Sequence, residues 1–168
     1  RSLTDNPKVS VIIETLEQHL PQMEDESCDT VVLVNILEHI EDDGAALKEL
    51  NRVLKPDGHL LLFVPALPFL FSDLDREHGH FRRYRLAPLT GLVQRNGFNV
   101  RYRRYFDLAG VLPWWLINTM GKKTKFNPKI VRFYDRYVVP IVRKMENWIS
   151  PPFGKNIILI AKRPSVDG

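Results

Sequence analysis

The stretch "DTVVLVNILEHIEDDGAALKELNRVLKPDGHLLLFVP", residues 29–65, contains two apolar runs separated by one amphipathic segment. The runs at 30–37 and 59–65 are almost continuous in Val, Leu, Ile and Phe, a composition typical of strands covered on both faces. Residues 43–54 place apolar side chains at helical spacing, and the Pro-Asp-Gly sequence that follows is expected to end the helix. A strand, a helix and a strand with short connections predict a parallel pair with a right-handed crossover.

The remainder of the chain extends this unit into an α/β fold. It adds a helix and three strands, predicted at residues 86–98, 9–16, 99–106 and 156–163. An insert at 107–155 precedes the last strand, and its apolar spacing predicts an amphipathic helix near 129–148 that Pro140 interrupts.

Composition is that of an ordinary globular protein, with 44% hydrophobic and 26% charged residues among 168. The single cysteine, Cys28, excludes an intrachain disulfide, and no apolar run has the ~18–20 residues of a membrane span. A cytoplasmic protein is therefore expected. Residues 101–150 hold eleven Lys and Arg but three Asp and Glu, which favours an anionic surface as partner. No nucleic-acid reading module accompanies the charge, so nucleic-acid binding is not expected.

The end of the first apolar run allows two interpretations. Glu38 and the acids after it are compatible with a capped helix start, because carboxylates stabilise helix N-termini. Ligands of open α/β sheets, however, bind at the carboxyl ends of strands. Asn35 to His39 and Pro65 to Phe69 both occupy such ends, so this stretch is equally compatible with a pocket rim.

Residues 24–65 resemble the central part of class I S-adenosylmethionine-dependent methyltransferases. The similarity rests on the acidic loop ending in Asp29, on "NILEHIED" at the strand exit, and on "LKPDGHLLL". It extends over about 9–163 and implies a Rossmann-like, mostly parallel sheet with a helical insert near 107–150. The resemblance further implies that the predicted strands lie side by side in the order 30–37, 59–65, 156–163 and 99–106.

The sequence departs from this family at its start. Only eight residues precede "VSVIIETL", which resembles the family's third strand, and the glycine-rich cofactor loop is not among them. We therefore expect 1–168 to be a single, N-terminally truncated methyltransferase domain with weak cofactor binding and impaired activity. The strand at 9–16 lacks its usual neighbours and is expected to pair elsewhere, for example with a second copy of the chain.

The resemblance assigns a cofactor role, for S-adenosylmethionine, to residues at two strand exits. Thr15 and Leu16 match the position that meets the adenine ring, and plain strand-exit residues are the structural alternative. Thr15 replaces the acid found in many members, which puts part of the adenine contact in doubt. Asn35 and Ile36 match the segment that passes the methionine part of the cofactor.

The acceptor side is assigned to two charged segments. Glu38 and His39 border it, and His39 is the candidate base for a hydroxyl acceptor. Arg82, Arg83 and Tyr84 are expected to face a small, anionic or glycan-type acceptor, because guanidinium groups suit phosphate and carboxylate. A solvated basic loop is the alternative interpretation of these three residues.

Two further features bear on partners. The His-x-His pair at 78–80 has no Cys or second His pair beside it in the sequence, so no metal site is predicted. Trp114 and Trp115, followed by four lysines in 122–129, fit either a helical cap with tryptophans packed inward or peripheral contact with a membrane.

Two functions follow from these patterns. The first is methyl transfer from S-adenosylmethionine to a small or glycan-type acceptor, at oxygen. The alternative is a non-catalytic methyltransferase-like module that docks on a partner or membrane through its basic insert. A different nucleotide-binding enzyme, such as a dehydrogenase, is disfavoured by "LKPDGHLLL".

Overall fold

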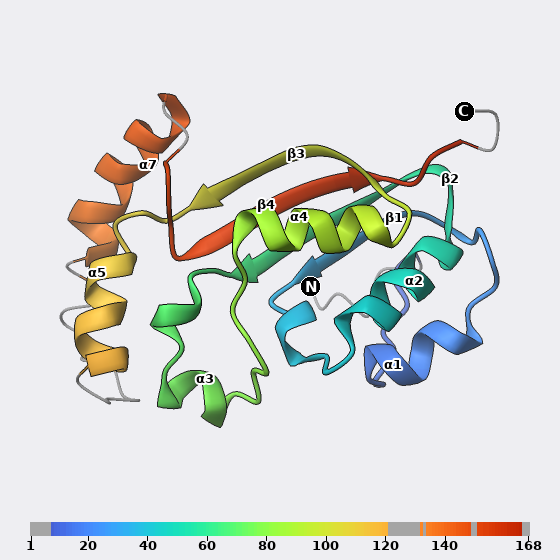
Figure 1. Ribbon diagram of the computed structural model, residues 1–168, viewed down its shortest axis with the longest axis horizontal. Coiled ribbons are helices and arrows are strands. Elements are labelled where there is room, and N and C mark those ends of the chain that lie inside the picture. The colour runs from blue at the N-terminus through green and yellow to red at the C-terminus, as the bar shows by residue number, and fades with distance from the viewer. Residues whose placement is uncertain (1–7, 121–131, 133, 149–150, 166–168) are drawn as a thin grey trace.

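The computed structural model describes residues 8–120, 132, 134–148 and 151–165. Four strands form one sheet in the order β1-β2-β4-β3 (Figure 1). β1 pairs with β2 in parallel, whereas β4 is antiparallel to β2 and to β3, so three of the four strands run in one direction. The α/β class and the predicted strand order are therefore confirmed. The strands are β1 Cys28–Val34, β2 Leu54–Pro65, β3 Asn99–Phe106 and β4 Asn156–Lys162.

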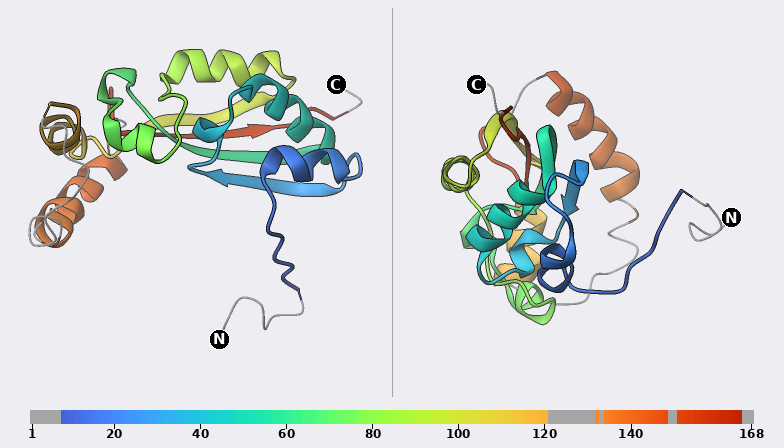
Figure 2. Two further views of the ribbon diagram at one scale, coloured as in Figure 1. Left: turned by 90° about the horizontal axis from the view of Figure 1, so that it is seen from below. Right: turned by 90° about the vertical axis from the view of Figure 1, so that its right-hand side faces the viewer.

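Helices cover one face of this sheet and one of its ends. α2 and α4 lie on the same face (Figure 2), and α5 and α7 lie beyond the end at which the three parallel strands finish (Figure 1). The helices are α1 Leu16–His19, α2 Asp43–Val53, α3 Asp73–Glu77, α4 Leu86–Arg95, α5 Val111–Trp114 and α7 Val139–Trp148. Short 3₁₀ turns lie at Leu20–Gln22, Leu37–His39 and Pro68–Leu70, and π-helical turns at Trp115–Met120 and Tyr134–Val138.

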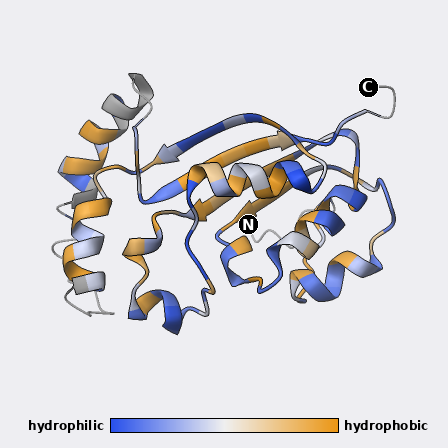
Figure 3. Cartoon of the chain, viewed as in Figure 1, coloured by the Kyte–Doolittle hydropathy of each residue, from blue (hydrophilic) through white to orange (hydrophobic). Residues whose placement is uncertain are grey.

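The core lies between the sheet and α2 and α4. Alternation along β1 buries Leu33 at 5% exposure, whereas Val32 and Val34 on the other face are 55% and 52% exposed. Figure 3 shows apolar residues along most of β2 and β4 and a more polar β3, as expected for an edge strand. The inner face is formed by Leu60, Leu62, Val64, Ile157 and Leu159, and the helices contribute Leu47, Leu50, Val53, Leu89 and Val93.

The strand predicted at 9–16 is wrong. Residues 8–14 form no strand, and their apolar side chains are exposed, from 36% at Val9 to 96% at Ile13. α1 begins at Leu16 because Thr15 and Gln18 form a capping box, each side chain accepting from the other's backbone N–H at 3.3 Å. Apolar composition favours a strand only where a neighbour can pair with it, and no strand of the described residues lies beside this segment. Association of two copies through 9–16 stays a prediction.

Two smaller boundaries also differ from expectation. β2 begins at Leu54, before the predicted strand, because the chain stays extended through an irregular pairing opposite Cys28 and Thr30. The interruption predicted at Pro140 is a change of helix type and not a break, because the π-helical turn Tyr134–Val138 ends and α7 begins directly before this residue. Pro140 lies in the first turn of α7, where the missing N–H is tolerated. The part of that predicted helix at 129–131 and 133 lies outside the described residues.

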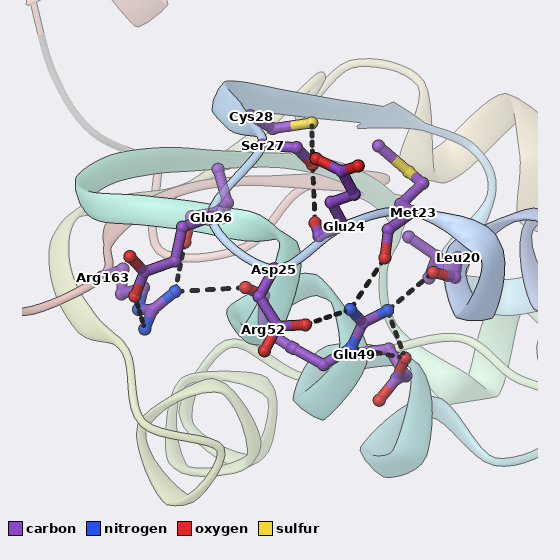
Figure 4. Close-up of polar contacts among 11 residues, drawn as sticks. Leu20, Met23, Glu24, Asp25, Glu26, Ser27, Cys28, Glu49, Arg52 and Arg163 are labelled. Atoms are coloured by element: carbon purple, nitrogen blue, oxygen red, sulfur yellow. Dashed lines mark hydrogen bonds and ion pairs between the residues drawn. The ribbon is translucent and has the colours of Figure 1, made fainter.

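The side chain of Arg52 holds the loop between α1 and β1 in place (Figure 4). The Arg52 guanidinium donates to the carbonyls of Leu20 and Met23 at 2.7 and 2.8 Å and to carboxylates of Asp25 and Glu49. α1 is thereby held against α2, since Arg52 lies in the last turn of α2. None of the helices in the described residues is long and apolar enough to cross a membrane.

Candidate functional site

The exit of β1 turns sharply at Asn35. This residue has a φ of 52°, a left-handed conformation that Asn tolerates better than most residues, and its N–H donates to the Phe63 carbonyl at 2.8 Å. The 3₁₀ turn that follows buries Glu38 completely and leaves His39 partly exposed. The turn therefore directs one polar side chain inward and one toward the surface.

The loop after β2 returns to the same end of the sheet. The Tyr84 N–H donates to the Pro65 carbonyl, and the Leu67 N–H donates to the Tyr84 carbonyl, both at 2.9 Å. Farther along, the Phe81 N–H donates to the Glu38 carbonyl at 2.8 Å. These bonds place the segment at 78–84 directly beside the β1 exit.

Two cavities adjoin at this junction. One, of about 520 Å³, is lined in part by the four residues predicted to hold the cofactor, Thr15, Leu16, Asn35 and Ile36. The other, of about 600 Å³, is lined by His39 and Arg83 from the predicted acceptor set. Asn35 and His39 line both cavities. The four predicted cofactor residues thus lie together, whereas Glu38, Arg82 and Tyr84 of the predicted acceptor set do not line the second cavity. The roles of both sets stay predictions.

A buried ion pair forms one wall of the second cavity. Arg83 binds Asp75 with a closest approach of 2.8 Å, and both side chains are almost fully buried. Burial alone would raise the pKa of Asp75, but its hydrogen bonds with Arg83 and Ser72 and the charge of Arg83 hold that pKa below its usual range. The guanidinium also lies 4.6 Å from the ring centroid of Trp114. Arg83 is therefore fixed from two sides.

Two imidazoles and a carboxyl group meet beside this pair. The rings of His39 and His80 are 4.6 Å apart, edge to face, and His80 Nδ1 lies 2.9 Å from an Asp75 oxygen. Burial lowers the pKa of His80 despite this carboxylate, so the ring is neutral and donates its Nδ1–H to Asp75. Burial also raises the pKa of Glu38 to about 7, against the lowering effect of Arg83.

The side chains of Arg82 and Tyr84 do not line the cavity and bind Asp43 instead. Arg82 pairs with Asp43 at 2.9 Å, and the buried Tyr84 hydroxyl donates to Asp43 at 3.0 Å. Burial, reinforced by Asp43, raises the pKa of Tyr84. These side chains join the loop to the start of α2, while the acceptor role predicted for them stays a prediction.

The two tryptophans of the insert differ in environment. The Trp114 indole N–H donates to the Leu70 carbonyl at 3.0 Å, and its ring packs against Arg83. Trp115 is 37% exposed, beside the exposed Leu112 and Leu116. Trp114 is therefore packed inward, as the helical-cap interpretation predicts. The lysines at 122, 123, 125 and 129 lie outside the described residues.

Sequence reasoning missed several residues of the second cavity, among them Asp75, His80, Trp114, Lys155 and Asn156. Asp75 and His80 could have been found, because they lie in the same charged segment as Arg83 and follow a strand parallel to β1. Lys155 could not have been found in this way, because it precedes β4, the antiparallel strand. Its position depends on the direction of that strand, which the sequence does not state.

Comparison with known proteins supports this architecture. Residues 1–62 match the family model "Methyltransferase domain". An uncharacterized 37.1 kDa protein in transposon TN4556 of Streptomyces fradiae is 31% identical over 91 residues, which are 52% of this chain and 25% of that protein. The chain therefore spans about a quarter of the length of this curated relative.

Solved structures extend the likeness to nearly the whole chain. An S-adenosylmethionine-dependent methyltransferase from Archaeoglobus fulgidus matches 93% of this chain and 68% of its own, with a TM-score of 0.58 and 13% identity. Phosphoethanolamine N-methyltransferase 2 of Haemonchus contortus, solved with S-adenosyl-L-methionine, matches 85% of this chain and 35% of its own, with a TM-score of 0.50 and 19% identity. The chain thus has the class I S-adenosylmethionine-dependent methyltransferase fold.

Proposed function

We propose that the chain is a methyltransferase domain that transfers a methyl group from S-adenosylmethionine to a hydroxyl of a small or glycan-type acceptor. The observation that carries this proposal is the pair of adjoining cavities that share Asn35 and His39. Methyl transfer requires the sulfonium and the acceptor atom to be held in line at short distance. Two cavities that meet at common residues offer that arrangement.

The cavity of about 520 Å³ is the cofactor side. Its volume is within the usual range for small-molecule sites, and Leu16 and Ile36 offer apolar surface for an adenine ring, with Thr15 beside them. The sequence contains no Gly-x-Gly motif, so a glycine-rich backbone cradle for the cofactor is not part of this wall. We expect this chain to bind the cofactor more weakly than micromolar.

The cavity of about 600 Å³ is the acceptor side. In the transfer, the bond from carbon to sulfur breaks as the bond from carbon to oxygen forms, and the hydroxyl proton must leave. His39 lies at the junction of the cavities, so its imidazole is the candidate proton acceptor. Arg83 is bound to Asp75, and Lys155 adds a second cation to the lining. Lys155 is itself paired with Asp107 at 3.0 Å, so this lining is polar with its charges balanced, and it favours a strongly polar acceptor such as a sugar hydroxyl.

Ligand-observed NMR with S-adenosylhomocysteine tests the cofactor side, because saturation transfer detects millimolar binding. Ile36→Lys places a charge in the cavity and should abolish transfer to the adenine protons. Val32→Lys is the matched control, since Val32 is also exposed, at 55%, but does not line the cavity. Equal signals from both variants, or no signal from the unmodified chain at millimolar ligand, would reject the assignment.

A second function, docking on an anionic membrane surface, is favoured by one observation. Exposed apolar side chains gather on α5 and the π-helical turn after it, with Leu112 at 61% and Leu116 at 51%. This turn itself has no Lys or Arg, but the sequence before and after it, within 101–150, holds eleven of them. Co-sedimentation with phosphatidylserine vesicles should fall in a Leu112→Ser, Leu116→Ser variant and persist in Phe153→Ser, an exposed control outside the insert helices. No sedimentation of the unmodified chain would exclude docking.

A further inference from the structure

Glu38 is a buried carboxyl group without a partner. Its side chain is 0% exposed, and neither oxygen receives a hydrogen bond from any residue that the structure describes. Arg83, whose charge acts on Glu38, is bound to Asp75 at 2.8 Å. A buried carboxylate in this state is costly, so this carboxyl group is stabilised either by a proton or by a bound cation.

Two imidazoles complete a set of metal ligands around this carboxyl group. One ligand atom each of Glu38, His39 and His80 lies within 4.8 Å of the others. In tetrahedral geometry, metal bonds of about 2.0–2.2 Å place ligand atoms about 3.3–3.6 Å apart, so side-chain movements of about 1–1.5 Å would close the set. This geometry is compatible with coordination of a single ion.

We propose that Glu38, His39 and His80 bind a divalent transition-metal ion at the edge of the acceptor cavity. Two imidazoles and a carboxylate suit zinc, iron or cobalt, whereas magnesium prefers oxygen ligands alone. Asp75 has the position of an orienting residue. It accepts the His80 Nδ1–H at 2.9 Å, which leaves the lone pair of the ring on Nε2.

The site has room for an exogenous ligand. His39 and His80 line the cavity of about 600 Å³, while Glu38 is buried behind them. An ion held by these three residues therefore faces the cavity with open coordination positions. If the proposed function holds, an acceptor hydroxyl binds there, its pKa falls, and its proton passes to solvent. His39 then serves as a ligand in place of a proton acceptor.

Calorimetric titration with Zn²⁺ tests the site in the tag-free chain, carrying Cys28→Ser so that the thiol does not compete. We expect one ion per chain, with affinity lowered at least about tenfold by Glu38→Gln and by His80→Asn. His78→Asn is the matched control. His78 lines the same cavity and belongs to the same His-x-His pair, but it is not in the ligand set, and its Nδ1 lies 2.7 Å from the Leu74 carbonyl oxygen.

A second readout keeps the test valid if a variant is less stable. Zn²⁺ should raise the midpoint of thermal unfolding of the unmodified chain and of His78→Asn, but not of Glu38→Gln, whose neutral side chain has nearly the same shape. No binding by the unmodified chain, or unchanged affinity in Glu38→Gln and His80→Asn, would overturn the proposal. Neither measurement requires cofactor or acceptor, so failure of methyl transfer would be a separate result.

Discussion

Replacement of Arg83 by Met should unfold much of the candidate site. Arg83 and Asp75 expose 2% and 1% of their side chains and form the ion pair at 2.8 Å. Removing one partner of such a pair leaves an uncompensated buried charge and costs about 3–5 kcal/mol. Because a domain typically has only ~5–15 kcal/mol of stability in total, this is a large fraction. The corresponding fall in Tm is about 6–20 °C for a chain of this size.

Arg82 provides the control for this measurement. It is the neighbouring residue and also forms an ion pair, with Asp43 at 2.9 Å, but 35% of its side chain is exposed. Asp43 is 12% exposed and keeps the hydrogen bond from the Tyr84 hydroxyl when Arg82 is removed. Solvent also screens the partly exposed Arg82, so Arg82→Met should lower Tm by less than Arg83→Met does. Urea unfolding followed by far-UV circular dichroism gives the free energies of unfolding, and thermal unfolding followed by the same signal gives the Tm values. If Arg83→Met costs no more than Arg82→Met, the buried pair does not organise this wall of the cavity.

Three further substitutions test the elements that position the site. Leu33→Ala should lower the free energy of unfolding by about 3–5 kcal/mol, whereas Val32→Ala should change it by no more than ~0.5 kcal/mol. Equal losses of stability in chemical denaturation would show that the core does not lie on the Leu33 face of β1. Asn35→Val should cost about 1–2 kcal/mol because a β-branched residue resists the left-handed conformation, and Asn35→Gly should cost little; the reverse order of Tm values would refute this turn geometry. Arg52→Ala should speed proteolytic cleavage between α1 and β1, because the hydrogen bonds from Arg52 to the loop are lost (Figure 4). An unchanged cleavage rate would show that other contacts hold the loop.

Much of the fold follows from local pattern. The apolar runs that became β1, β2 and β4 are buried on one or both faces, and helices at 43–53 and 86–95 follow the spacing of their apolar residues. The run at 9–16 has the same composition and still forms no strand. Backbone pairing requires a neighbour in space, and composition carries no information on whether that neighbour exists. The Thr15 capping box was the local signal in favour of a helix start.

The candidate site was predictable to the extent that it lies at strand ends. Asn35 and Ile36 follow β1, and the chain topology alone places such residues at a ligand edge. The association of His80 with His39 could not be read from spacing, because 40 intervening residues fold back through α3 and the bonds of Tyr84 with Pro65 and Leu67. Likewise, the fully buried state of Glu38 depends on the Phe81 segment packed over it.

The most direct test of the adjoining cavities is a two-dimensional ¹H–¹⁵N NMR titration of the chain with S-adenosylhomocysteine. We expect the largest amide shifts at Thr15, Leu16, Asn35 and Ile36 and smaller shifts at His39, while amides of α4 such as Val93 stay unchanged. Shifts confined to the insert helices, or none at a saturating ligand concentration, would contradict the assignment of the cofactor and acceptor sides.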